Sequence, residues 1–401
     1  MSVRPCPSVQ VHTHPSTLLH TLPSVRLLIH PRLLVRCWFV VMMILLFNPA
    51  FASAASLDLA TSVPLVRARQ IEFFGDLGYV AQNMDGAALV DFRDPASPHL
   101  LRQFPPEVMQ PLFFRVYPSQ KRLFSADRFR GFVIYDISRP EEPTTVSVLA
   151  LGGMTTGFDL TKTDSGRDLA VLSRAGQGLL AVDITDPTRP QITDTFTSGI
   201  ELTRGVAVRD GVVYAADSSE GLLKVLRISD AGKFEPLYQV VLPGMCQSII
   251  TAGDYLVVGY GYMGLRIYQF PAAGITGNGK MAPAAGGAET AAGDSSSTPV
   301  LRLVCTTLRN RNRVKGMAAS VGKHWLFTAN EQMGIDMHDI ENPAFPVLIG
   351  EYVPRDSRIS VQGVTMKDDL LFAPAWDAGV LVFRIQDGPP PANFDLENLN
   401  K

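Results

Sequence analysis

The stretch AVDITDPTRP, residues 181–190, holds the pattern that decides the fold. A run of strand-forming residues stops at Asp186-Pro187, and a second proline follows three residues later. Proline presets φ for the second position of a turn, and the aspartate before it can accept hydrogen bonds from backbone amides two residues on. The stretch therefore predicts a strand that ends in a tight turn.

Nearly the same pattern occurs three more times in the chain. The copies read LVDFRDPASP (89–98), VIYDISRPEEP (133–143) and DMHDIENPAFP (336–346). Strand alternation sends the apolar neighbours to one face of a sheet and the aspartate between them to the other. The strand-end aspartates are therefore predicted to be structural residues rather than a catalytic carboxylate set: Asp91, Asp136, Asp183 and Asp339.

A glycine opens each apolar run, and the spacing of these glycines gives the length of the repeat. Successive glycines are 45, 47, 43, 43, 70 and 45 residues apart: Gly86, Gly131, Gly178, Gly221, Gly264, Gly334 and Gly379. A unit of about 45 residues is the period of a β-propeller blade, and rings of about four to eight blades close. The sequence therefore predicts an all-β fold, a seven-bladed β-propeller of four-stranded blades.

The four strands of a blade can be followed in residues 203–242. Four short runs rich in Val, Ile, Leu and Tyr alternate there with Gly, Asp and Pro turns. After Arg384 the last unit offers no fourth strand, whereas LDLATSVPLV (57–66) is a spare apolar run before the first unit. We expect this N-terminal run to complete the last blade as its outer strand and so close the ring, which would cover an exposed sheet edge.

These motifs resemble the LVIVD-repeat family of bacterial β-propellers, whose unit reads approximately G-L-x-V-V-D-I-S-D-P-x-x-P. The closest copy is 178–187, and other good copies are 86–98, 131–143 and 334–346. The remaining units depart from the pattern, with Leu226, Gln269 and Arg384 where Asp would stand. The resemblance covers roughly residues 60–390 and implies a surface or periplasmic propeller, without a shared activity.

The first 54 residues have the order of a secretory signal peptide. Arginines precede an uncharged apolar run at 38–47, and small residues follow at 50–54. The run is well short of the roughly 20 residues that a membrane-spanning helix needs. We expect cleavage after Ala52 or Ala54 and an exported protein (periplasmic, cell-surface or extracellular) with no stable membrane span afterwards. Residues 1–30 exceed a usual n-region, so whether they are translated stays open.

The chain accordingly divides into an N-terminal extension with a signal peptide, 1–54, and a propeller, 55–401. The one long interval between glycines contains residues 272–299, which are crowded with Ala, Gly and Ser. Such a composition cannot bury enough apolar surface to fold, which predicts a flexible insertion between the third and fourth strands of the fifth blade.

Composition and motifs give no sign of a cofactor, a metal or a nucleic acid. The net charge of −2 indicates no nucleic-acid partner. No G-x-S-x-G elbow, calcium loop or phosphate loop occurs, and only three histidines follow residue 54: His99, His324 and His338. The cysteines after residue 54, Cys246 and Cys305, can form a disulfide or remain as buried thiols.

The remaining candidate is the face where the turns between second and third strands meet the starts of the inner strands, which we call the loop face. Its residues differ in type from blade to blade, which either neutral drift of exposed loops or an asymmetric recognition surface would explain. Aromatic and arginine anchors are typical of interface hot spots. On the second interpretation the binding residues are Arg115, Asp127, Arg174, Arg204, Asp217, Tyr260, Tyr262, Asn330 and Trp376.

These sequence features are compatible with two functions. The first is a non-catalytic, monomeric scaffold that binds an envelope or extracellular protein, or a glycan, through the loop face. The second is a hydrolase or lyase at the mouth of the central channel, with Asp127 or Asp217 as general base, which requires a carboxylate with a shifted pKa in a desolvated cleft. The lack of a recognisable catalytic set favours the first function.

Overall fold

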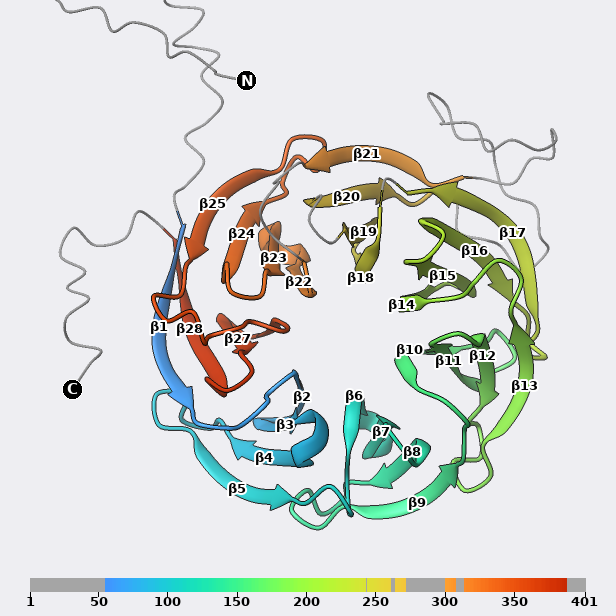
Figure 1. Ribbon diagram of the computed structural model, residues 1–401, viewed down its shortest axis with the longest axis horizontal. Helices are drawn as coiled ribbons and strands as arrows, with labels where there is room; N and C mark the ends of the chain where they lie inside the picture. The colour runs from blue at the N-terminus through green and yellow to red at the C-terminus, as the bar shows by residue number, and fades with distance from the viewer. Residues whose placement is uncertain (1–54, 243, 261–263, 272–299, 308–313, 388–401) are drawn as a thin grey trace, which may run out of the picture. The chain divides into compact units, whose positions relative to one another are not determined.

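The computed structural model describes residues 55–242, 244–260, 264–271, 300–307 and 314–387. These residues form seven antiparallel sheets of four strands each, arranged as the blades of a ring (Figure 1). The fold is a seven-bladed β-propeller, which confirms the prediction from the glycine spacing. Helical structure among the described residues consists of three short 3-10 turns: η1 (Asn83–Asp85), η2 (Pro118–Gln120) and η3 (Val321–Lys323).

In six sheets the strands follow chain order from the inner strand to the outer one. The first three blades contain β2 (Gln70–Phe74), β3 (Leu77–Ala81), β4 (Ala87–Asp91) and β5 (His99–Phe104); β6 (Pro111–Tyr117), β7 (Arg122–Asp127), β8 (Gly131–Asp136) and β9 (Thr144–Leu149); and β10 (Thr155–Lys162), β11 (Asp168–Arg174), β12 (Gly178–Asp183) and β13 (Gln191–Phe196). The next three contain β14 (Thr203–Arg209), β15 (Val212–Asp217), β16 (Leu222–Ile228) and β17 (Phe234–Val241); β18 (Cys246–Ala252), β19 (Tyr255–Tyr260), β20 (Gly264–Gln269) and β21 (Arg302–Thr307); and β22 (Gly316–Ser320), β23 (Trp325–Ala329), β24 (Ile335–Asp339) and β25 (Val347–Tyr352).

The seventh sheet combines strands from the two ends of the described chain. It contains β26 (Thr365–Lys367), β27 (Leu370–Pro374), β28 (Val380–Asp387) and β1 (Ala55–Val63), with β1 at the outer edge. β1 pairs antiparallel with β28 from Ala55 opposite Asp387 to Val63 opposite Val380. The sequence predicts that the run 57–66 forms the outer strand of the last blade. In the structure, the outer strand of this sheet is β1.

Strand direction defines two faces of the ring. Because neighbouring strands are antiparallel, the second-to-third turns and the connections from each outer strand to the next inner strand emerge together, on the loop face. The first-to-second and third-to-fourth turns, including the Asp-Pro turns, emerge on the opposite face. Side chains on the loop face are therefore far apart in sequence but neighbours around one opening.

The repeated Asp-Pro turn has the geometry that its sequence predicts. In all four copies a carboxylate oxygen accepts a hydrogen bond of 2.8–2.9 Å from the amide two residues further on. The acceptors are Asp91, Asp136, Asp183 and Asp339. Each of the four ends its strand and binds the backbone of the turn that follows, as expected of a strand-end residue.

In five blades the repeat glycine is required because the outer strand passes directly over it. All seven repeat glycines have positive φ, between 62° and 96°. A Cβ atom at Gly178 would lie 2.1 Å from the carbonyl oxygen of Phe196, at the end of β13. In the seventh blade a Cβ at Gly379 would lie 1.9 Å from the carbonyl of Val63, at the end of β1. β1 therefore takes the same place over its glycine as the outer strands of other blades.

The apolar core lies between blades. Tyr79 of the first blade packs in one buried cluster with Phe114 of the second, and Phe372 of the seventh packs in another with Ile71 of the first. Removing apolar surface from water stabilises a protein by about 25 cal/mol per Å². The contacts between blades therefore hold the inner strands at fixed positions around the centre.

Several expectations from the sequence fall on residues outside the described ranges. These are the signal peptide within 1–54 and the insertion at 272–299, which the chain places between β20 and β21. Among the described residues, no helix has the length and apolar character needed to span a bilayer.

The contact at the repeat glycines gives a direct stability test. Gly178→Ala should lower the free energy of unfolding by about 3–5 kcal/mol, because it adds a steric clash with the Phe196 carbonyl to the strain of a positive φ. Gly176→Ala is the matched control, since Gly176 has φ 69° and a methyl group added there would meet no atom within 4 Å. The control should lose only about 1 kcal/mol. If urea denaturation shows that both variants lose the same free energy of unfolding, the account is contradicted.

Candidate functional site

A cavity lies at the centre of the ring, where the inner strands face one another. Its volume is about 380 Å³, within the range of about 300–1,000 Å³ typical of small-molecule sites. Residues of β2, β6, β18, β22 and β26 line it. The inner strands of five blades therefore contribute to one concave site.

The walls of the cavity differ in polarity. Arg69, Gln70, Glu72 and Arg115 line it from the first and second blades. Ile249, Ile250, Met317, Ala318, Val364 and Met366 line it from the fifth, sixth and seventh blades. The charged residues of the lining therefore all come from the first two blades, whereas the other blades contribute apolar residues together with Ser248, Gln362 and Thr365.

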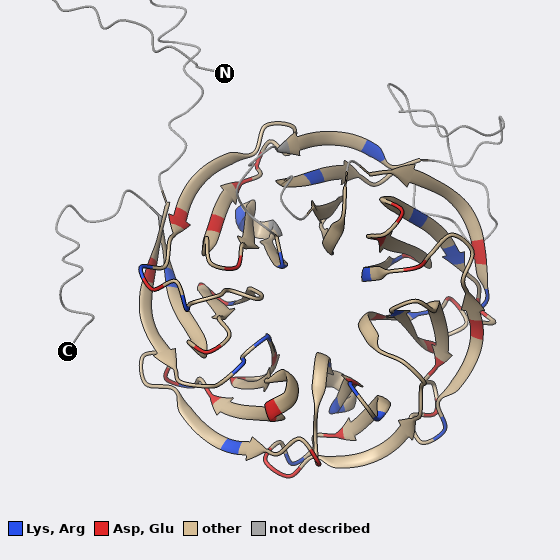
Figure 2. Ribbon diagram, viewed as in Figure 1, with Lys and Arg blue, Asp and Glu red and all other residues tan. Residues whose placement is uncertain are grey.

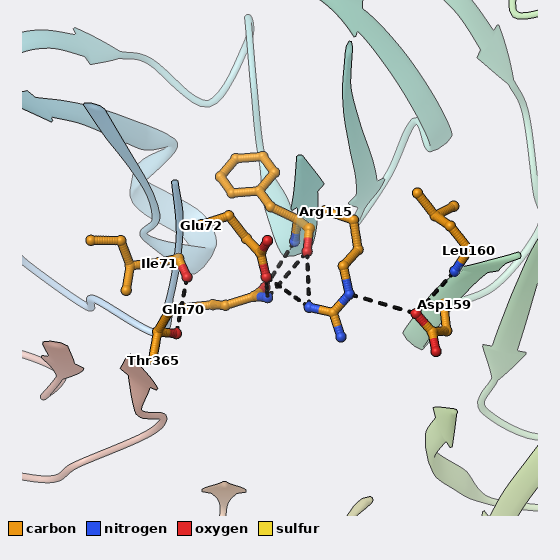
Figure 3. A network of polar contacts seen from close by, with 8 residues as sticks. Gln70, Ile71, Glu72, Arg115, Asp159, Leu160 and Thr365 are labelled. Atoms are coloured by element: carbon orange, nitrogen blue, oxygen red, sulfur yellow. Dashed lines mark hydrogen bonds and ion pairs between the residues drawn. The ribbon is translucent and has the colours of Figure 1, made fainter. Parts of the chain in front are cut away.

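A hydrogen-bonded network forms the polar wall (Figure 3). Gln70 binds the backbone of Phe114 in the next blade twice, accepting from its amide at 2.8 Å and donating to its carbonyl at 3.1 Å. Gln70 also donates to Glu72 Oε1 at 3.0 Å, and the same oxygen accepts from Arg115 at 2.8 Å. These contacts tie the inner strands of the first two blades together.

Arg115 carries the positive charge of this wall, between two carboxylates. It pairs with Glu72 on β2, and its Nε lies 4.0 Å from Asp159 Oδ1 on β10 (Figure 3). Burial would lower the pKa of Arg115, but Glu72 and Asp159 outweigh burial and raise that pKa, so the guanidinium stays charged. Burial raises the pKa of Asp159, and Arg115 and two backbone amides offset only part of that effect.

Sequence reasoning singled out Arg115 but missed its two partners. Arg115 pairs with Phe124, Glu72 with Tyr79 and Asp159 with Val171, so the three occupy equivalent positions in neighbouring inner strands. Opposite charges at equivalent positions of adjacent repeats are the signal that could have identified the network.

Five residues expected to bind a partner on the loop face are buried. They share the position four residues before the repeat glycine and keep at most 9% of their surface exposed: Asp127, Arg174, Asp217, Tyr260 and Asn330. The position lies at the end of the second strand or directly after it. Four of these side chains hydrogen-bond to different neighbouring groups, namely those of Asp127, Asp217, Tyr260 and Asn330, and these local contacts account for part of the variation in residue type.

Asp217 shows how specific these local roles are. Its two carboxylate oxygens accept hydrogen bonds from the amides of Glu201, Leu202, Ser219 and Glu220 and from the Ser219 hydroxyl. Burial alone would raise the pKa of Asp217, but these hydrogen bonds outweigh it and lower the pKa. A carboxylate that is saturated with donors and has a lowered pKa is a poor general base.

Asp127 is enclosed in a different way. It accepts hydrogen bonds from the Ser125 hydroxyl and, at 3.4 Å each, from the Gln110 amide and the Tyr135 hydroxyl. Burial raises the pKa of Asp127, and these bonds together with Arg130 counteract only part of the shift. Neither Asp127 nor Asp217 is among the residues that line the cavity.

The other predicted residues have diverse positions. Arg204 is exposed on β14 and Trp376 is half-buried, whereas the Tyr260 hydroxyl lies 3.4 Å from that of Tyr268 inside the fifth blade. Burial lowers the pKa of Arg174. Tyr262 lies outside the described residues. Among the described members of the set, the structure therefore brings only Arg115 to the cavity and leaves Arg204 exposed.

Neither a disulfide nor a cluster of metal-ligating side chains is found among the described residues. Cys246 and Cys305 are free, and burial raises the pKa of the Cys246 thiol to about 12. No group of three or more His, Cys, Asp or Glu side chains in the described part of the chain could hold a metal ion.

Comparisons with known proteins support the fold alone. No protein-family model and no curated protein matches the sequence. Among solved structures, the chain is similar to the β-propeller domain of Myceliophteria thermophila Cps50 (Swd1), with a TM-score of 0.62 and 12% identity over 82% of this chain and 100% of that one. It is also similar to the computationally designed protein Ika8, with a TM-score of 0.54 and 11% identity over 82% of this chain and 99% of that one.

The hydrogen bonds of Asp217 predict a pH-dependent contribution to stability. Because folding lowers its pKa, the carboxylate stabilises the fold above its unfolded pKa of about 4, and this stabilisation disappears as the pH falls through the folded value. Asp217→Asn should cost about 3 kcal/mol at pH 7, and the difference from the parent protein should shrink below about pH 4. Asp377→Asn, in the exposed turn of the seventh blade, is the control and should change little. If the difference in the free energy of unfolding between Asp217→Asn and the parent protein does not change between pH 7 and the region below pH 4, the assignment is contradicted.

Proposed function

We propose that the protein is an exported, non-catalytic binding platform that engages a protein partner through its loop face. The propeller fold suits such a role, because it holds connections from separate blades on one rigid surface. The observation that carries the proposal is the distribution of exposed apolar side chains.

Exposed large apolar side chains gather on the loop face. Eight lie in its connections, namely Val66, Met84, Val108, Phe129, Met154, Met245, Met333 and Val353. Among the described residues, the turns of the opposite face contribute one such side chain, Phe345, and the other five lie on outer strands. Exposure of this kind is unfavourable in water, and side chains grouped on one face are typical of interaction sites.

The chemistry of this apolar set favours a protein partner. Methionine and phenylalanine are enriched at protein interfaces, and methionine adapts its shape to a partner surface. Arg204 and Arg128 lie on the same face and supply the polar element of interface hot spots. Sequence reasoning missed Met84 and Phe129; a large apolar residue within a glycine-terminated turn is the signal that could have found them.

The N-terminal sequence supports export, since arginines, an apolar run and small residues follow one another within 1–54. The likeness of the Asp-Pro units to the LVIVD-repeat family supports the same location, at the cell surface or in the periplasm. A folded propeller delivered there would present its loop face to envelope or extracellular proteins.

The alternative, a hydrolase or lyase, has weaker support. It relied on Asp127 or Asp217 as general base, and both carboxylates are buried and hydrogen-bonded within their own blades. The cavity keeps a charged group in Arg115, but its carboxylate neighbours are engaged by that arginine and by backbone amides. These contacts favour binding over proton transfer.

Two equally exposed phenylalanines on opposite faces allow a matched test. Phe129 is 75% exposed on the loop face and Phe345 is 74% exposed on the other. Phe129→Glu should reduce recovery of the partner at least about tenfold in affinity purification from the native host, because it places a charge in a desolvated contact. Phe345→Glu should recover the partner like the parent protein.

The comparison by mass spectrometry separates the possible outcomes. Proteins that both variants recover equally are background. Loss of the same protein in both variants, or in neither, would contradict the assignment of the loop face, and recovery of a glycan that Phe129→Glu leaves unchanged would contradict a protein partner.

A further inference from the structure

Charge does not mark out one sector of the loop face. In Figure 2, Lys and Arg positions (blue) and Asp and Glu positions (red) occur in blades all around the ring. Hydrogen bonds between connections, exposed apolar side chains and backbone conformation together single out one sector, where the seventh blade meets the first.

Backbone hydrogen bonds join the two blades at this junction. The amide of Ala68, just before β2, donates to the carbonyl of Trp376 in the β27–β28 turn at 3.0 Å, and the amide of Trp376 donates to the carbonyl of Ala68 at 3.0 Å. The side-chain amide of Gln82 donates to the carbonyl of Val66 at 2.9 Å, which adds the β3–β4 turn. Three connections of the loop face therefore meet here.

Each of these connections contributes a large apolar side chain. Val66 is 54% exposed and Met84 is 50% exposed, whereas Trp376 is half-buried. The junction thus adds an aromatic ring to two members of the exposed apolar set.

The same three connections hold backbone conformations that most side chains avoid. Eight residues other than glycine in the described chain have a positive φ. Four of them occupy first-to-second turns on the opposite face, namely Lys121, Asp210, His324 and Asp368. Three of the other four lie at the junction, namely Arg67 (φ 50°), Asn83 (φ 54°) and Trp376 (φ 52°). On the loop face, left-handed residues other than glycine are therefore concentrated where the two blades meet.

Trp376 is the least suited of the loop-face residues to a left-handed backbone. Asn83, Glu331 and Trp376 all lie three residues before a repeat glycine, with φ between 52° and 54°. Asparagine tolerates this region well, and Glu331 forms an ion pair with Lys315 at 2.9 Å. A bulky aromatic residue is a strained choice at the same position.

The indole of Trp376 also lies outside the core. Trp376 belongs to none of the buried apolar clusters, and no ring pair, cation–π contact or side-chain hydrogen bond joins it to another described residue. Trp325, in contrast, is 7% exposed and packs edge-on against Phe327, with ring centroids 6.3 Å apart. Strained residues cluster at binding sites, where the surrounding structure holds them in place.

We propose that Trp376 is the anchor residue of the loop face and that its indole enters an apolar pocket of the protein partner, with Val66 and Met84 beside it. This inference rests on the proposed function. A buried indole N–H needs an acceptor, so the partner's pocket combines apolar walls with a carbonyl or carboxylate oxygen. Tryptophan is enriched among interface hot spots and offers a large contact area at a low cost in conformational entropy.

The first measurement is thermal unfolding of two variants of the purified chain. Trp376→Asn places a residue that tolerates a positive φ in the same turn, so its Tm should equal that of the parent or exceed it by up to about 3 °C. Trp325→Phe removes part of a buried ring from β23, so its Tm should fall. If Trp376→Asn fails to fold or loses more than about 3 °C, the ring is structural and the proposal is overturned.

The second measurement is affinity purification from the native host, quantified by mass spectrometry against a strain without the tagged chain. Trp376→Asn should recover at least about tenfold less of the partner than the parent does, although it is equally stable. Trp325→Phe, although less stable, should recover the partner like the parent at a temperature where it is folded.

Phe129→Glu, purified in parallel, separates failure of the anchor from failure of the proposed function. Loss of a protein with Trp376→Asn and not with Trp325→Phe supports the anchor, whatever Phe129→Glu does. If Trp376→Asn recovers every protein like the parent, the anchor assignment is overturned. The loop face then keeps its role if Phe129→Glu loses a protein, and both proposals fail if neither variant does.

Discussion

Five blades depend on one close approach, between the end of the outer strand and the glycine that opens the third strand. The carbonyl of Phe196 stands where a side chain at Gly178 would begin, and that of Val63 stands in the same way over Gly379. The contact needs a positive φ and no Cβ, so it requires glycine at this place in those repeats. It sets the register of the third and fourth strands and thereby the shape of the blade that packs against its neighbours.

A rigid ring of this kind separates positions that build the fold from positions that are free to acquire function. The Asp-Pro turns and repeat glycines satisfy backbone groups at the edges of the blades. Inner-strand positions such as those of Glu72, Arg115 and Asp159 are not required by the repeat, so different charges can occupy them and meet across blades. The same holds for the positions of Met84 and Phe129 in the loop-face turns, whose side chains are 50% and 75% exposed.

The sequence predicted the fold well because its rules are local. Glycine spacing, the Asp-Pro turn and alternating apolar residues each follow from backbone geometry within one repeat, and they gave seven blades and the structural role of Asp91 and its equivalents. The candidate site was predicted poorly because it depends on distances between repeats. Asp217 and Tyr260 were expected at a binding surface, but both are buried, with Asp217 bound to backbone amides and the Tyr260 hydroxyl 3.4 Å from that of Tyr268. The variation in residue type four residues before the repeat glycine had suggested an exposed surface. A buried position can vary in the same way, because it can meet a different neighbour in each blade.

The central claim is that the loop face, and not the opposite face, meets a protein partner. The most direct measurement is site-specific photo-crosslinking in the native host, with a benzophenone side chain at position 129 in one strain and at position 345 in another. The account predicts a discrete protein adduct from position 129 and none from position 345, two sites with equal exposure in the free protein. The same adduct from both positions, or an adduct from position 345 alone, would contradict it.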